Sequence, residues 1–312
     1  MAQRYRRLVL VGIAIAIAGG LVFLTHRAEA RAVWHELGRI PPTAVGAALL
    51  LVFGQVTCQA LRLWAVIPRD RFISMPRAAY AFMLGEWTNM FTPARAGDAL
   101  KVVLLNRGAS ISLPQATGAM LADKVVNIGS LILLCAVSGV AGTIWTTAWA
   151  RGALPLTALL IGALLATALL LVPKSRVRIL GRLIVLQHEL ARGFTALADP
   201  KRLVISTAFS FGAWLAELLA LQILCAAVGS PQPLQNLVLA VAVLNVGISV
   251  PMSPANVGIY EMALAFGLSR AGLPGPAALA VATVHHGIQL LAVNVAAAAL
   301  TLWASALSSP TT

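Results

Sequence analysis

The sequence predicts an all-α polytopic membrane protein with about six transmembrane helices and two re-entrant broken-helix hairpins. Hydrophobic residues make up 59% of the 312 residues and charged residues only 11%, unlike a soluble domain. Six apolar runs reach or nearly reach the roughly 20 residues that a helix needs to cross the hydrocarbon core. A single membrane domain is expected to fill residues 1–312, with halves at about 1–150 and 151–312. The six runs are 8–24, 44–61, 117–141, 153–172, 203–228 and 277–302.

The net charge of +13 indicates an anionic partner. The basic residues lie in the gaps between the apolar runs and form no single basic arm, so we expect membrane lipids and no nucleic acid as partners. Cys58, Cys135 and Cys225 each lie inside an apolar run, without the spacing of a metal or redox motif. They are interpreted as small core residues, and no metal or cofactor is expected.

The first run follows Arg4, Arg6 and Arg7, which predicts a cytoplasmic N-terminus in the inner membrane. A cleaved signal peptide with its site near residues 28–30 is the alternative. An even number of spans also places the C-terminus in the cytoplasm. Residues 27–39 are expected in an external loop. The loops expected in the cytoplasm carry Arg62, Arg69, Arg71, Arg77, Lys174, Arg176, Arg178, Arg182, Arg192, Lys201 and Arg202.

The second basic loop contains a candidate amphipathic helix at about 176–197. Apolar residues recur there at helical spacing, while Arg178, Arg182, Glu189 and Arg192 take the other face. This pattern is typical of a helix that lies on anionic headgroups. A soluble connector between two spans is the alternative.

Two further apolar segments, 78–92 and 237–250, are short and each runs into a proline- and glycine-rich stretch. Such residues free backbone groups, which at membrane depth must be buried in protein or face a wet cavity. We therefore predict re-entrant hairpins near 78–107 and 237–270. The helix-breaking residues are Pro93, Gly97, Pro251, Pro254 and Gly258.

The two hairpins indicate an internal repeat. Residues 93–97 match residues 254–258 in Pro, Ala and Gly at a shift of 161, although chance could supply so short an identity. Three predicted spans separate the hairpins, so the second would enter from the opposite face. Broken segments at matching positions of two inverted halves are typical of a substrate site near the bilayer midplane.

The same blocks carry a family resemblance. Residues 85–98, GEWTNMFTPARAGD, and residues 251–261, PMSPANVGIYE, resemble elements of the flippase-like transmembrane region of lysylphosphatidylglycerol synthases and their stand-alone relatives. The resemblance covers nearly the whole chain and implies a helical domain that moves or presents a lipid headgroup. Asp98 stands where this family commonly has Glu, and Asn127 stands where it has a carboxylate. The soluble aminoacyl-transfer domain has no counterpart in residues 1–312, so lysyl transfer is not expected.

Ionisable residues inside a membrane bundle are costly and therefore mark candidate functional sites. Arg95 offers a planar fork that suits a lipid phosphate, and Lys101 and Lys124 add point charges. The carboxylates could receive a cationic headgroup or couple to protons. The alternative is mutual neutralisation of Arg95 by Asp98, or of Asp123 by Lys124, that merely holds broken helices together. The cavity candidates are Glu86, Asn89, Arg95, Asp98, Lys101, Asp123, Lys124, Glu217, Asn256 and Glu261.

Some of these polar residues have a structural interpretation. Asn89 and Asn256 are expected to cap freed backbone groups rather than bind a ligand. His285 and His286 are expected to pack or hydrogen-bond rather than bind metal, because adjacent positions point to different helix faces. Glu217 has no charged neighbour within a turn and needs a partner from another helix.

No catalytic signature is present in the sequence, and no enzymatic activity is expected. The function expected is translocation or presentation of a polar-headed lipid across the inner membrane. An accessory subunit of a lipid or glycan biosynthesis system and a membrane-embedded lipid-modifying enzyme are the alternatives. Candidate protein partners are a second copy of the chain and lipid-biosynthesis enzymes.

Overall fold

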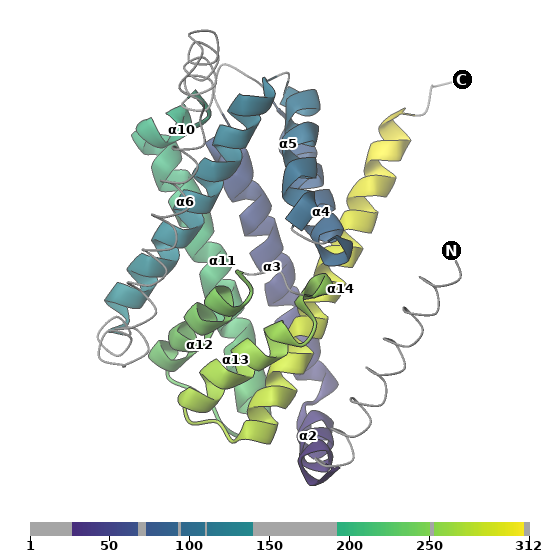
Figure 1. Ribbon diagram of the computed structural model, residues 1–312, viewed down its shortest axis with the longest axis vertical. Coiled ribbons are helices and arrows are strands. Elements are labelled where there is room, and N and C mark those ends of the chain that lie inside the picture. Colours follow the sequence, from purple (N-terminus) through teal and green to yellow (C-terminus); the bar gives the residue numbers. More distant parts are fainter. Residues whose placement is uncertain are drawn as a thin grey trace, which may run out of the picture.

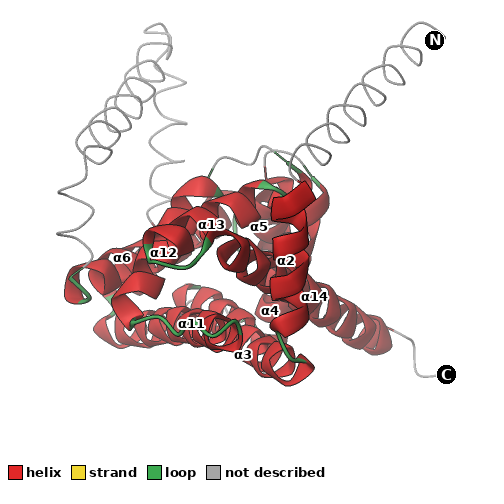
Figure 2. Cartoon of the chain, turned by 90° about the horizontal axis from the view of Figure 1, so that it is seen from below, coloured by secondary structure: helices red, strands yellow, loops and turns green. Residues whose placement is uncertain are grey.

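The computed structural model describes residues 27–67, 73–92, 95–109, 111–139, 192–249 and 253–308. Within these ranges all regular elements are helices (Figure 2). The predicted runs 8–24 and 153–172 lie outside the described residues, as does most of the candidate amphipathic helix at 176–197. Its last residues include the short helix α10 (Thr195–Ala198).

Four helices in the described part are long and apolar enough to cross a membrane. They contain 25, 25, 28 and 34 residues, so the shortest is about 37 Å long at 1.5 Å per residue. All four have a proline in the first turn, where a helix needs no amide donor. They confirm four of the six predicted spans: α3 (Pro42–Val66), α6 (Leu113–Val137), α11 (Pro200–Ala227) and α14 (Gly275–Ser308).

The structure refines one prediction about loops and contradicts another. Residues 27–39, expected in an external connection between spans, form the short helix α2 (Arg27–Arg39), in which Arg39 pairs with Glu36 at 3.1 Å. Arg62, expected in a cytoplasmic loop, is buried inside α3 because this helix continues for one more turn.

The two broken segments form two helical hairpins. The first consists of α4 (Met75–Phe91) and α5 (Ala96–Ala109), and the second of α12 (Leu234–Gly247), the 3-10 turn η2 (Pro254–Asn256) and α13 (Ile259–Arg270). These helices have 12 to 17 residues, fewer than a span needs. The chain therefore turns back at both predicted breaks.

The hairpins start from opposite ends of the bundle and meet near its middle (Figure 1). The α4–α5 hairpin opens toward the end where α3 finishes, and the α12–α13 hairpin opens toward the end near α2. Helix α4 contacts η2, so the turn of the second hairpin packs against the first.

Glycines let the two arms of each hairpin approach closely. A side-chain carbon added at Gly97 would overlap the carbonyl oxygen of Gly85 across the first hairpin. In the second hairpin, a carbon at Gly267 would lie 2.7 Å from the Cα of Ala240. Both contacts involve backbone, which cannot rotate away as a side chain could.

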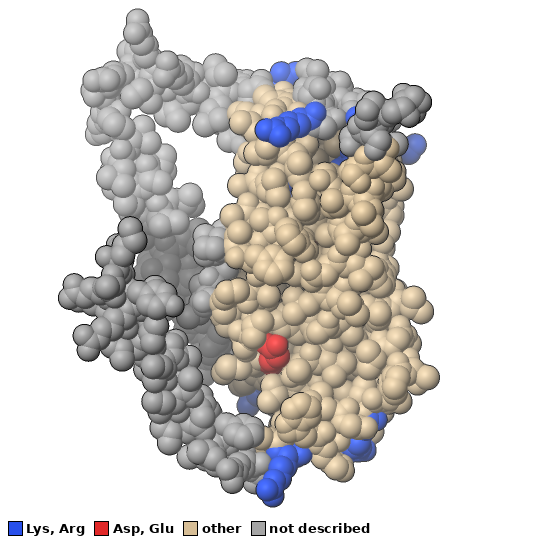
Figure 3. All heavy atoms as spheres, turned by 90° about the vertical axis from the view of Figure 1, so that its right-hand side faces the viewer, with Lys and Arg blue, Asp and Glu red and all other residues tan. Residues whose placement is uncertain are grey.

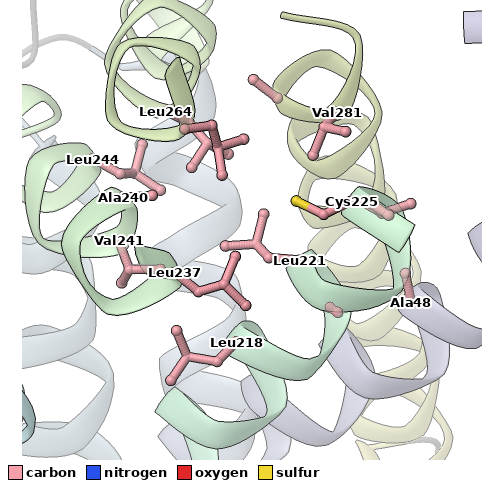
Figure 4. Close-up of a cluster of buried hydrophobic side chains, with 14 of the residues drawn as sticks. Ala48, Leu218, Leu221, Cys225, Leu237, Ala240, Val241, Leu244, Leu264 and Val281 are labelled. Atoms are coloured by element: carbon pink, nitrogen blue, oxygen red, sulfur yellow. The ribbon is translucent and has the colours of Figure 1, made fainter. Parts of the chain in front are cut away.

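An apolar core holds the second hairpin to the long helices. Leu237, Val241 and Leu244 of α12 pack with Leu221 of α11 and Val281 of α14 (Figure 4). On the face shown in Figure 3, Lys and Arg lie at the two ends, and a largely uncharged band separates them. Charged ends around an apolar band are what a bilayer requires of a multi-pass protein.

Candidate functional site

Charged side chains from three helices converge at the first hairpin. Lys101 of α5 is only 2% exposed, and its ammonium group contacts the carboxylate of Glu86 on α4. It also lies 3.2 Å from Asp98 Oδ1, one turn earlier on α5. Lys124 of α6 reaches the other oxygen, Asp98 Oδ2, at 3.0 Å. We call Glu86, Asn89, Arg95, Asp98, Lys101 and Lys124 the ion cluster.

Asn89 belongs to this cluster instead of capping the broken helix. Its amide nitrogen donates to Asp98 Oδ1 at 3.3 Å, and its carbonyl oxygen Oδ1 is buried without a hydrogen-bond partner among the described residues. The side chain therefore orders the carboxylate, and its free acceptor lies beside Gly97.

Arg95 is the least committed cation in the ion cluster. It lies just before α5 with φ at 55°, a region that side-chain-bearing residues rarely adopt. Its Nε is 3.6 Å from Asp98 Oδ2, which is too long for a hydrogen bond, and makes no hydrogen bond within the described part of the chain. The side chain is 38% exposed. Asp98 is already bound by Lys101, Lys124 and Asn89, so the guanidinium has donors to offer.

The ion cluster carries an excess of positive charge. Arg95, Lys101 and Lys124 face two carboxylates, Glu86 and Asp98, which leaves one net positive charge. An unbalanced cation within an apolar bundle is costly, and an anion bound beside it would offset that cost.

Asp123 does not join this site, nor does it pair with Lys124. It accepts from Arg62 of α3 at 2.7 and 3.3 Å, and Arg62 also donates to Asn127 and to Ser210 of α11. Adjacent positions on α6 point in different directions, which separates Asp123 from Lys124. Asp123 is thus part of a buried clasp that joins α3, α6 and α11.

The tip of the second hairpin holds Glu261 in a different arrangement. Glu261 Oε2 accepts from the amide of Gly258 at 2.7 Å, and Oε1 lies 2.8 Å from His286 Nδ1 on α14. His286 Nε2 lies 3.0 Å from the carbonyl oxygen of Ala255. Asn256 occupies the adjoining turn with φ at 56°. Glu261 therefore caps a broken helix, as part of a site separate from the ion cluster.

The two adjacent histidines bond to different partners, as their positions predict. His285 Nδ1 lies 2.9 Å from the hydroxyl of Tyr260, whereas His286 bonds to Glu261 and Ala255. Among the described residues, no group of three or more His, Cys, Asp or Glu side chains could hold a metal ion.

Glu217 finds the partner on another helix that it was expected to need. Gln55 of α3 donates to its Oε2 at 3.0 Å, and Gln289 of α14 donates to Gln55 at 2.8 Å. This triad, in which Gln55 and Glu217 are buried, lies among α3, α11 and α14. Sequence reasoning missed Gln55 and Gln289, although amides inside long apolar runs were a visible signal.

Together, these features define a multi-pass helical membrane protein with two opposed hairpins and a cationic cluster at one of them. Its sequence matches the model of the lysylphosphatidylglycerol synthase transmembrane region over residues 9–297. The chain belongs to this family, which makes it an integral membrane protein of lipid biosynthesis or handling. No curated protein and no solved structure matches the chain.

Proposed function

We propose that this protein binds the anionic headgroup of a membrane lipid at the ion cluster and moves or presents it across the inner membrane. Arg95 carries the proposal, because its Nε has no hydrogen-bond partner among the described residues and the cluster has one excess positive charge. A guanidinium can bind a phosphate through two parallel hydrogen bonds. Lys101 and Lys124 are held by carboxylates and would position Asp98 and strengthen the local field.

The opposed hairpins support a path through the membrane. Each is too short to span, and their tips contact each other near the middle of the bundle (Figure 1). We interpret the hairpins as re-entrant elements of two inverted halves. Such halves can expose one central site alternately to the two faces of the membrane.

The orientation follows from the charge of the two ends. We propose that the end carrying the start of α11 faces the cytoplasm, by the positive-inside rule. Helix α14 finishes at the same end, which would place the C-terminus there as well (Figure 1). That end holds Arg77, Arg107, Lys201 and Arg202, whereas the other holds Arg270, Arg31 and Arg39, of which Arg39 is paired with Glu36.

A catalytic step is not part of this proposal. The histidines and carboxylates that lipid-modifying chemistry could use are tied into helix contacts at Glu261, Glu217 and Asp123. We propose a transport or presentation role in which covalent chemistry, where needed, belongs to a partner.

Lipid binding by Arg95→Gln tests the proposal. The substitution leaves two lysines against two carboxylates, so the cluster becomes neutral and no buried carboxylate is stranded. We expect wild-type protein to retain phosphatidylglycerol in native mass spectrometry better than diacylglycerol with the same chains. Arg95→Gln should reduce that preference roughly tenfold, which corresponds to about 1.4 kcal/mol for one lost charge-assisted contact.

Arg107→Gln is the matched control, because Arg107 lies in the last turn of the same helix and its side chain is exposed. It removes the same charge without touching the cluster. Equal retention of phosphatidylglycerol by wild type and Arg95→Gln, with both proteins monodisperse, would contradict the headgroup assignment.

A further inference from the structure

The turn of the second hairpin is held in a strained conformation. Ala255 and Asn256 follow each other with φ at 52° and 56°. Residues with a side chain adopt this region only where their surroundings hold them. The carbonyl oxygen of Ala255 is bonded to His286 on α14, and the amide of Gly258 is bonded to Glu261. The pair of His286 and Glu261 therefore ties both sides of the turn to α14.

This arrangement requires a proton. A carbonyl oxygen only accepts, so His286 Nε2 must carry a hydrogen toward Ala255. An ionised carboxylate also only accepts, so His286 Nδ1 must carry a second hydrogen toward Glu261, unless Glu261 itself is protonated. In both cases the pair holds one proton more than a neutral imidazole with an ionised carboxylate. Without that proton, a nitrogen lone pair would face a carboxylate oxygen at 2.8 Å.

The titratable groups that adjoin this pair are Tyr260 and His285. The ring of Tyr260 stacks on His286 at 4.1 Å, and its hydroxyl bonds to the neighbouring His285. Four titratable groups on helices that pack against α14 are paired elsewhere. They are Glu86 with Lys101, Arg62 with Asp123, Glu217 with Gln55 and Glu36 with Arg39.

The exposures of the two side chains indicate a route for the proton. The His286 side chain is only 4% exposed, whereas the Glu261 side chain is 18% exposed. Glu261 is therefore the member of the pair that can exchange a proton with water. His286 is the member whose hydrogen bond to Ala255 depends on that proton.

We propose that His286 and Glu261 form a proton-binding site that closes the turn of the second hairpin. The bound proton allows both bonds of His286, and its release to water past Glu261 would free the Ala255 carbonyl. The turn is closed at low pH and opens as pH rises. Because the turn packs against α4, which carries Glu86, opening would also alter the ion cluster. This last consequence rests on the proposed function.

Spin-label mobility at the turn tests the site without any added lipid substrate. Val257 is 58% exposed, so a label there reports the turn once Cys58, Cys135 and Cys225 have been replaced by Ala. In purified full-length protein scanned from about pH 5 to about pH 8, we expect the mobile component of the spectrum to grow as the pH rises. The growth should follow a single-proton curve. A spectrum that does not change with pH would overturn the proposal.

Glu261→Gln removes the need for the extra proton while keeping the hydrogen bonds that hold the turn. The amide can still accept from Gly258 and can donate to His286 Nδ1, so a neutral histidine satisfies every bond. We expect this variant to stay closed at all pH values in that range. An unchanged titration in Glu261→Gln would overturn the proposal, because the proton would then lie elsewhere.

His35→Gln is the matched control, since the His35 side chain is 75% exposed on α2. It should leave the titration as in the wild type. Loss of the titration in this control would assign the effect to the surface and contradict the site. The spectra need no lipid activity, so a failure here leaves the headgroup proposal standing, and the reverse also holds.

Discussion

The two hairpins share a backbone design and differ in the chemistry at their tips. Each brings its arms together at glycine and turns through residues with positive φ, namely Arg95 in the first and Ala255 and Asn256 in the second. The first tip gathers three cations and two carboxylates, whereas the second holds one His–Glu pair. Under the proposed function, this difference predicts that an anion binds at the first tip and not at the second.

The two hairpin tips should differ most in how much stability is lost when one buried side chain is replaced. Lys101→Met should destabilise the protein by roughly 3 kcal/mol, because the loss of a buried cation strands Glu86 while Asp98 keeps Lys124. His286→Gln in the second hairpin should cost roughly 1–2 kcal/mol, because glutamine keeps one hydrogen bond. Equilibrium unfolding in mixed detergent micelles measures both. Equal losses of unfolding free energy in the two variants would contradict the expected difference between the two tips.

A smaller effect tests what the hairpins share. Gly97→Ala and Gly267→Ala should each cost about 1–3 kcal/mol, since the new carbon meets backbone in both cases. Gly287→Ala on α14 meets nothing within 4 Å and should be neutral or slightly stabilising. The same unfolding measurement applies. If only one hairpin is sensitive to its glycine, the two backbone frames are not equivalent.

Sequence patterns predicted the helices well, because apolar length and proline breaks are local signals. The segment around Pro93 and Gly97 ends α4 where expected, and the four described spans lie over predicted runs. The sequence pattern placed Arg62 in a loop because a charged residue at the end of an apolar run usually marks the end of a span. Its partner Asp123 lies 61 positions away, and sequence spacing does not reveal such a pairing.

The sequence predicted which residues are candidates for the site but not how their side chains contact each other. Arg95, Lys101 and Asp98 were predicted as site residues because charged side chains in a broken apolar segment are costly and therefore mark candidate functional sites. Which carboxylate each cation contacts depends on how α4, α5 and α6 pack. For that reason the alternative in which Lys124 neutralises its neighbour Asp123 is wrong, since Lys124 contacts Asp98 on another helix. His286 was treated as structural, since its bond to Glu261 spans 25 positions.

Transbilayer movement of a fluorescent lipid tests whether lipid headgroups pass through the ion cluster. Purified wild-type, Arg95→Gln and Arg107→Gln proteins would be reconstituted at equal density into vesicles with fluorescent phosphatidylglycerol, whose outer leaflet is then quenched chemically. We expect wild type and Arg107→Gln to expose the inner-leaflet lipid at equal rates, and Arg95→Gln to be roughly tenfold slower, a difference of about 1.4 kcal/mol. Movement by Arg95→Gln at the wild-type rate would contradict this expectation.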